Sequence, residues 1–218
     1  MSTTTTADLA YLRRAGLAGL VAGILFPTMI VVTTAFEWHY MHDQWGWRLT
    51  KDTQAAYPSG LSTGPLGFLQ IANFAVTGLL VLVLGLGLVR TLERGASRIV
   101  TRFGFGIMGL ALMTSAFPTD FFYRPMADHA PVSWHGWIHD VSFYVLMLLG
   151  VLPSTIAFAI SARRTPHWRR WALPTLLVPA ALFASLFGLV PAPWGFYLLI
   201  LVWMGWIAAA GHRLRRLG

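Results

Sequence analysis

Two histidines and one aspartate in the second half of the chain have the spacing of a metal-binding or proton-handling site. His135 and His139 are four residues apart, so a helix would place both imidazoles on one face. This spacing suits two ligands of one divalent transition metal such as zinc. Asp120, in the preceding stretch Phe-Pro-Thr-Asp, would be the third ligand or would orient a histidine. Alternatively, His135 and His139 hydrogen-bond loop carbonyl groups and pin the loop.

Two further acids are candidates for a catalytic role. A bound metal ion lowers the pKa of its water ligand to about 7, and a nearby base can then take the proton. Asp140 or Glu37 would be that base, because both are expected at the same end of the helices as the histidines. The candidate catalytic residues are therefore Asp120, His139, Asp140 and Glu37.

One face of an earlier apolar segment is expected to line a polar pocket. Gln70, Asn73 and Thr77 recur at positions i, i+3 and i+7, so a helix presents them together. Polar groups at this depth of a membrane need partners, which favours a pocket over a lipid-facing position. Trp137 is the fourth expected lining residue, although it also fits an interfacial belt of aromatic side chains.

The elements that must position these residues follow from the composition. Of the 218 residues, 56% are hydrophobic and 11% are charged, whereas an average soluble domain has about 25% charged residues. This excludes a soluble globular enzyme, a disordered chain and a nucleic-acid-binding domain, and it indicates an integral membrane protein. Because the chain has no cysteine, disulfides, thiolate zinc sites and iron–sulfur clusters are excluded as well.

A transmembrane helix needs about 20 mainly apolar residues. We predict an all-α bundle, one domain over residues 1–218, with six transmembrane helices. The predicted spans are residues 15–36, 67–89, 103–117, 134–160, 172–190 and 195–211. The third and sixth are short, so we expect their ends to extend into the flanking residues. Gly19 and Gly23 form a G-x-x-x-G spacing, which we expect to serve packing within the chain.

The basic residues indicate the orientation in the membrane. With these spans, 13 of the 16 basic residues fall on one side, namely Arg13, Arg14, Arg90, Arg94, Arg98, Arg102, Arg163, Arg164, Arg169, Arg170, Arg213, Arg215 and Arg216. The other side holds Arg48, Lys51 and Arg124. The positive-inside rule then places both termini in the cytoplasm and the chain in the cell (cytoplasmic) membrane. The net charge of +8 is therefore a topology signal, and no nucleic-acid partner is expected.

Three functions are consistent with these features. The first is an integral membrane protein of unknown activity, with a His/Asp polar site at the extracytoplasmic end of the bundle. The second is a metal-dependent, hydrolase-like membrane enzyme that acts on a lipid or another amphiphile. The third is a small-molecule binder or a pH-sensitive sensor in which the histidines and the aspartate lock the outer loops. A transporter is disfavoured, because the middle and inner parts of the bundle lack ionisable residues.

Two short motifs resemble a known family. Phe117-Pro118-Thr119-Asp120 and the following Gly136-Trp137-Ile138-His139 are similar to the F-P-x-D and G-x-x-H motifs of six-helix bacterial membrane proteins catalogued as domain-of-unknown-function family 998. The resemblance implies functional importance for Asp120 and His139, with Gly136 as a close-packing residue. Where many members have proline after the aspartate, this chain has Phe121. The resemblance implies a fold and a site but no reaction.

A weaker likeness is to membrane hydrolases of the ceramidase and adiponectin-receptor kind. Those proteins use histidines, including an H-x-x-x-H pair, and an aspartate around zinc inside a helical bundle. The likeness is one of residue types only. The two differ in the number of helices, because those proteins usually have seven and six are predicted here.

Overall fold

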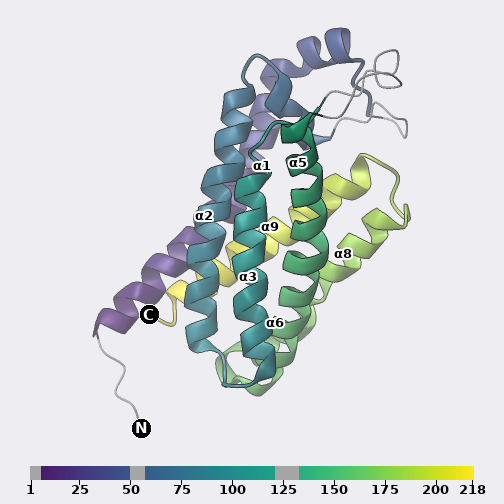
Figure 1. Ribbon diagram of the computed structural model, residues 1–218. Helices are drawn as coiled ribbons and strands as arrows, with labels where there is room; N and C mark the ends of the chain where they lie inside the picture. The colour runs from purple at the N-terminus through teal and green to yellow at the C-terminus, as the bar shows by residue number, and fades with distance from the viewer. Residues whose placement is uncertain (1–5, 50–56, 121–132) are drawn as a thin grey trace.

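The computed structural model describes residues 6–49, 57–120 and 133–218, and within these ranges the chain folds into helices without a β-strand (Figure 1). The α-helices are α1 Thr6–Trp45, α2 Gly67–Thr91, α3 Ala96–Thr114, α5 Trp134–Tyr144, α6 Leu152–Arg164, α7 Ala172–Thr175, α8 Leu177–Leu186 and α9 Trp194–Arg215. Two short 3₁₀ helices, η1 Pro58–Thr63 and η3 Pro166–Trp171, lie between them. The π-helical stretch η2 Val145–Val151 joins α5 to α6.

Five helical segments are long and apolar enough to cross a bilayer, and they confirm the predicted helical membrane bundle. They are Thr6–Trp45, Gly67–Thr91, Ala96–Thr114, Trp134–Arg164 and Trp194–Arg215. The short third span extends at its N-terminal end, as expected, because α3 begins at Ala96 and reaches 19 residues.

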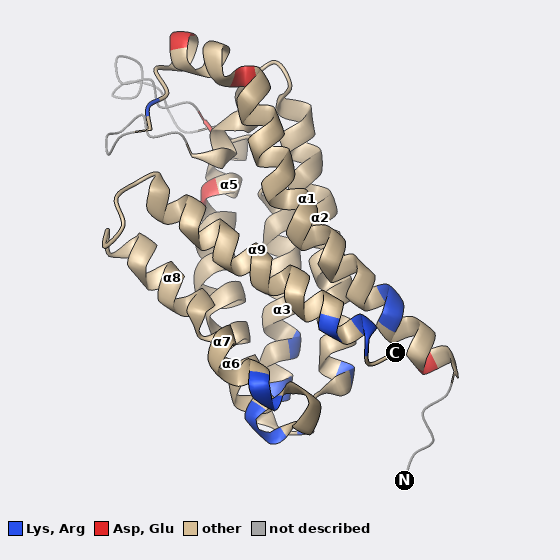
Figure 2. Ribbon diagram, turned by 180° about the vertical axis from the view of Figure 1, so that it is seen from behind, with Lys and Arg blue, Asp and Glu red and all other residues tan. Residues whose placement is uncertain are grey.

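The predicted span 172–190 does not form one continuous helix. It consists of α7 and α8, which have four and ten residues and are separated at Leu176. Pro179 explains the break, because a proline has no N–H to donate to the carbonyl group of Thr175 four residues earlier. In Figure 2, α7 and α8 run back along the bundle towards the start of α9. A sixth complete span remains a prediction.

Charged residues separate towards the two ends of the bundle. Figure 2 shows the arginines gathered where α1 begins, where α2 meets α3, around α6 and where α9 ends. We call this the arginine end, and the opposite end, where α1 ends and α5 begins, the histidine end. Arg48 lies three residues after the end of α1 and so at the histidine end, whereas Lys51 and Arg124 fall outside the described residues.

Glycines allow α1 and α9 to pack backbone against backbone. A Cβ atom on Gly211 of α9 would lie 2.6 Å from the carbonyl oxygen of Gly16 of α1. A Cβ atom on Gly23 would lie 2.6 Å from the backbone nitrogen of Ala208 on α9, and Gly19 is packed equally closely against Leu84 of α2. The expected packing of Gly19 and Gly23 within the chain is confirmed. Small residues allow such an approach where no hydrophobic effect drives helices together.

Replacement of Gly211 by alanine should destabilise the bundle, because the added methyl group overlaps the α1 backbone. We expect a loss of about 2 kcal/mol, the usual cost of overpacking. Gly205→Ala is the matched control, because a Cβ atom on Gly205, also on α9, would have nothing within 4 Å. It should be neutral or slightly stabilising. Thermal unfolding of both variants, followed by fluorescence of the 10 tryptophans, checks this, and equal melting temperatures would contradict it.

The arginine end is closed by η3. Trp168 is fully buried there and donates from Nε1 to Thr91 Oγ1 at 2.9 Å. Arg213 Nη2 donates to the carbonyl oxygen of His167 at 3.3 Å. Burial lowers the pKa of His167 below 6.5, a backbone hydrogen bond to Thr91 partly offsets this effect, and the positive charge of Arg213 adds to the lowering. His167 therefore remains neutral in the folded protein at pH values where it is protonated in the unfolded chain.

Mild acid should weaken the fold through His167. As the pH falls below 6.5, the unfolded chain takes up a proton that the folded protein resists, so the free energy of unfolding decreases. His167→Gln should flatten this dependence in melting temperatures measured between pH 5 and 8. His212→Gln, at an exposed histidine of the same end, should leave it unchanged. An unaltered slope in His167→Gln would refute this assignment.

Candidate functional site

Helix α5 begins with a serine that connects it to the segment after α3. Ser133 is the N-cap residue, and its Oγ accepts a hydrogen bond from Gly136 N at 3.0 Å. Such a cap satisfies one of the free N–H groups at a helix start. Ser133 also donates from N and from Oγ to the Asp120 carboxylate, at 2.7 and 2.6 Å. Asp120 therefore lies at the N-terminus of α5, where the helix dipole favours a negative charge.

His135 joins the same group through one ring nitrogen. Its Nδ1 lies 3.0 Å from the carbonyl oxygen of Pro118 and 2.9 Å from Ser133 Oγ. Because the carbonyl oxygen only accepts, Nδ1 must carry the hydrogen atom, and Ser133 Oγ accepts from it while donating to Asp120. The same nitrogen is 3.8 Å from Asp120 Oδ1. Every hydrogen-bonding capacity of the Ser133 hydroxyl is thus used.

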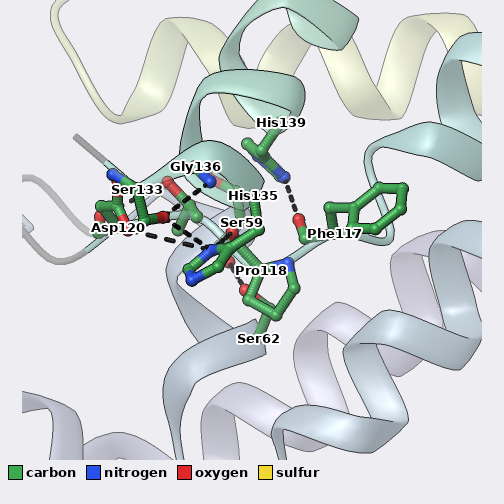
Figure 3. Close-up of polar contacts among 10 residues, drawn as sticks. Ser59, Ser62, Phe117, Pro118, Asp120, Ser133, His135, Gly136 and His139 are labelled. Carbon is green, nitrogen blue, oxygen red and sulfur yellow. Dashed lines mark hydrogen bonds and ion pairs between the residues drawn. The ribbon is translucent and has the colours of Figure 1, made fainter.

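His139 satisfies two carbonyl groups beyond the end of α3. Its Nδ1 lies 2.9 Å from Ser115 O and 2.8 Å from Phe117 O, and the side chain is buried, with 5% exposed (Figure 3). The last carbonyl groups of a helix lack partners within the helix. Asp120, Ser133, His135 and His139, with the carbonyl groups they bind, form what we call the α3–α5 hydrogen-bond cluster. It holds the start of α5 against the end of α3.

Gly136 is the position where α5 approaches the aspartate most closely. A Cβ atom there would overlap the Asp120 carboxylate. Figure 3 shows Gly136 directly beside Asp120 and Ser133. This explains physically why F-P-x-D and G-x-x-H belong together: the glycine makes room for the aspartate, and the histidine binds the carbonyl groups of the same segment.

The contacts of the two histidines bear on the predicted metal centre. In both histidines Nδ1 is bound to carbonyl groups, an arrangement that also occurs in metal-binding histidines and leaves Nε2 as the nitrogen that would bind an ion. Across the described part of the chain, no group of three His, Asp or Glu side chains gathers closely enough to hold an ion. These contacts are of the kind expected if the histidines pin the loop. The predicted zinc ligands His135, His139 and Asp120 remain a prediction.

A cavity of about 440 Å³ lies beside the cluster. It is lined by residues of α1, α2, α3, α5, η2, α8 and α9, with η1 and the loop after α8 at the histidine end. Its apolar wall includes Phe26, Phe74, Leu112, Phe143, Leu146, Met147, Phe196, Ile200 and Trp203. The polar side chains that reach it include Ser115, His139 and Asp140. The combination of an apolar wall with a few polar groups is typical of small-molecule sites.

The structure keeps three of the predicted catalytic residues together and separates the fourth. His139 and Asp140 line the cavity, and His139 shares the hydrogen-bond cluster with Asp120. Glu37 is buried, with 2% exposed, at the N-terminus of α2, where its Oε1 accepts a hydrogen bond from Leu66 N. Its placement suits a cap for α2.

The predicted pocket-lining residues lie elsewhere. Gln70, Asn73 and Thr77 share one face of α2, as their spacing predicts, and are buried. Asn73 Nδ2 donates to Phe26 O at 3.1 Å and to Gln70 Oε1 at 3.2 Å, and Thr77 Oγ1 donates to Asn73 Oδ1 at 3.4 Å. Asn73 therefore connects α2 to α1, and Gln70 and Thr77 bind Asn73 within α2. None of the three lines the cavity, and Trp137 is 61% exposed.

Sequence reasoning missed Ser133 and the apolar residues that line the cavity. A serine directly before a predicted helix is an N-cap signal, so Ser133 could have been found. The cavity has no comparable signal, because its wall combines single residues from helices far apart in the chain.

Replacement of Gly136 by alanine should destabilise the protein by about 2 kcal/mol, because the methyl group overlaps the Asp120 carboxylate. In an Asp120→Gly background the same replacement should cost much less, since the overlapping group is gone. A double-mutant cycle on melting temperature measures this coupling. Gly106→Ala, at a glycine with open space around it, is the control. Additive effects of the two substitutions would contradict the close contact.

Comparisons with known proteins agree with the two motifs. No curated protein and no solved structure matches the chain. A family model described as "Protein of unknown function (DUF998)" matches residues 52–213, which include α2, α3, the α3–α5 hydrogen-bond cluster and most of α9. The chain therefore belongs to the DUF998 family.

Proposed function

We propose that this membrane protein binds an amphiphilic small molecule in the cavity beside the α3–α5 hydrogen-bond cluster. The observation that supports the proposal is the cavity itself, which has a volume of about 440 Å³, within the usual range of about 300–1,000 Å³ for ligand pockets. A ligand with an apolar chain and a polar head matches its wall, because aromatic and aliphatic side chains predominate and the polar groups are few.

The depth of the cavity suits an apolar chain. Phe196 lies near the start of α9, whereas Ile200 and Trp203 lie further along the helix. At a rise of 1.5 Å per residue, the seven steps from Phe196 to Trp203 span about 10 Å. Phe143 and Met147 also line the cavity and follow the same direction along α5 and η2. The wall thus continues well into the bundle from its polar end.

The arginines support an orientation for this site. Because cytoplasmic loops carry the excess of Lys and Arg, the arginine end is assigned to the cytoplasm, with both termini inside. The histidine end and the polar end of the cavity would then face the extracytoplasmic side of the cell membrane. A ligand would enter from the outer leaflet or from the adjacent aqueous phase.

The α3–α5 hydrogen-bond cluster has a supporting role in this proposal. His139 belongs to the cluster through Nδ1 and to the cavity lining through the rest of its ring. By holding α5 on α3, the cluster keeps one wall of the cavity in place. In this proposal Asp120, Ser133 and His135 position the wall of the pocket and do not contact the ligand.

Filling the cavity should weaken binding strongly. A tritiated panel of dodecylamine, dodecan-1-ol and dodecanoate is offered to the protein in nanodiscs, with uptake by empty nanodiscs subtracted. At least one member should bind the wild type and bind Ile200→Trp at least about tenfold more weakly, a difference of 1.4 kcal/mol. The matched control is Leu201→Trp, because Leu201 is the next residue and is 62% exposed.

A second variant separates loss of binding from loss of folding. Ser185→Phe fills the cavity from α8 at a half-buried position, and both filled variants are checked by melting temperature. Loss of binding in a folded filled variant, with binding retained in Leu201→Trp, supports the proposal. If no member of the panel distinguishes the wild type from the filled variants, the proposal is wrong.

A further inference from the structure

The polar end of the cavity is rich in hydrogen-bond acceptors. His139 illustrates this through its tautomer. Its Nδ1 carries the hydrogen atom, because both of its partners, Ser115 O and Phe117 O, are carbonyl oxygens that only accept. In the neutral imidazole the other nitrogen, Nε2, therefore has a lone pair and no hydrogen.

The Nε2 atom of His139 is available to a ligand. It has no hydrogen-bond partner among the described residues, and it is not one of the buried polar atoms that are sealed from water-sized space. Since His139 is 5% exposed overall and lines the cavity, the accessible part of the ring adjoins that space. A lone pair in this setting needs a donor.

Ser115 is a second acceptor. Its Oγ donates its only hydrogen atom to Ala111 O at 2.8 Å, so the lone pairs of the hydroxyl oxygen remain. The side chain is buried, with 3% exposed, and lines the cavity. Ser115 and His139 are adjacent, because the same histidine binds the Ser115 carbonyl group.

Asp140 is the third acceptor and gives the cavity its charge. It is half-buried, lines the cavity and has no hydrogen-bond partner among the described residues. The described lining contains no Lys or Arg to neutralise it. The other polar lining residues carry hydroxyl groups that both donate and accept, namely Tyr57, Ser59, Tyr144 and Ser185. The fixed polar groups thus favour a ligand that donates hydrogen bonds and disfavour an anion.

We infer that the amphiphile has a hydrogen-bond-donating head group, and that a primary ammonium suits the site better than a carboxylate or a phosphate. This inference rests on the function proposed above. An ammonium has three donors and a positive charge, which match His139 Nε2, Ser115 Oγ and the Asp140 carboxylate. A carboxylate head has no donor, and it would lie beside a carboxylate of like charge in surroundings where water screens poorly.

The test compares head groups on one chain length. Dodecylamine, dodecan-1-ol and dodecanoate are measured against wild type, Ile200→Trp and Asp140→Asn in nanodiscs at pH 8. In the wild type, dodecylamine should bind at least about tenfold more tightly than dodecanoate, with the alcohol between them. Asp140→Asn keeps the shape of the side chain and removes its charge. It should weaken dodecylamine about tenfold and change dodecan-1-ol by less than about threefold.

The outcomes separate this inference from the proposed function. If dodecanoate binds the wild type as tightly as dodecylamine and Ile200→Trp loses both, the cavity binds amphiphiles but the head-group inference is wrong. The inference is also wrong if Asp140→Asn, folded by melting temperature, affects the amine and the alcohol equally. If Ile200→Trp binds all three as the wild type does, the proposed function itself fails.

Discussion

The structure at the histidine end depends on one requirement: the backbone carbonyl groups after α3 must find hydrogen-bond donors in apolar surroundings. A carbonyl group left without a partner at membrane depth costs several kcal/mol. Here the donors come from α5, because His139 binds Ser115 O and Phe117 O, and His135 binds Pro118 O. Asp120 is drawn to the start of α5 by Ser133, and Gly136 leaves room for it.

This requirement also determines what the cavity can bind. Since the carbonyl groups orient the His139 ring, they decide that its free nitrogen is an acceptor in the neutral imidazole. Asp140 follows His139 on α5 and lines the same cavity. The hydrogen bonds at Nδ1 thus determine that Nε2 is an acceptor. In metal-bound histidines, the hydrogen-bond partner of the non-ligating nitrogen fixes the tautomer in the same way.

The two ends of the molecule are built differently. At the arginine end, buried Trp168 binds the side chain of Thr91, and the surface carries a concentration of positive charge. The histidine end instead uses backbone carbonyl groups, capping interactions and buried carboxylates such as Glu37. Between the ends, glycines bring α1 and α9 into direct backbone contact, and α8 and α9 leave space for the cavity.

The sequence by itself determined the helical membrane bundle, the separation of charge and the family motifs around Asp120 and His139. These properties follow from local composition and spacing, because a bilayer demands long apolar helices and a helix repeats every 3.6 residues. Only the tertiary structure decided that the histidines face carbonyl groups, that Glu37 caps α2, and that Asn73 connects α2 to α1 instead of lining the pocket. It also decided the break at Leu176 and the cavity. Spacing shows which side chains share a face, but their partners come from helices distant in the chain.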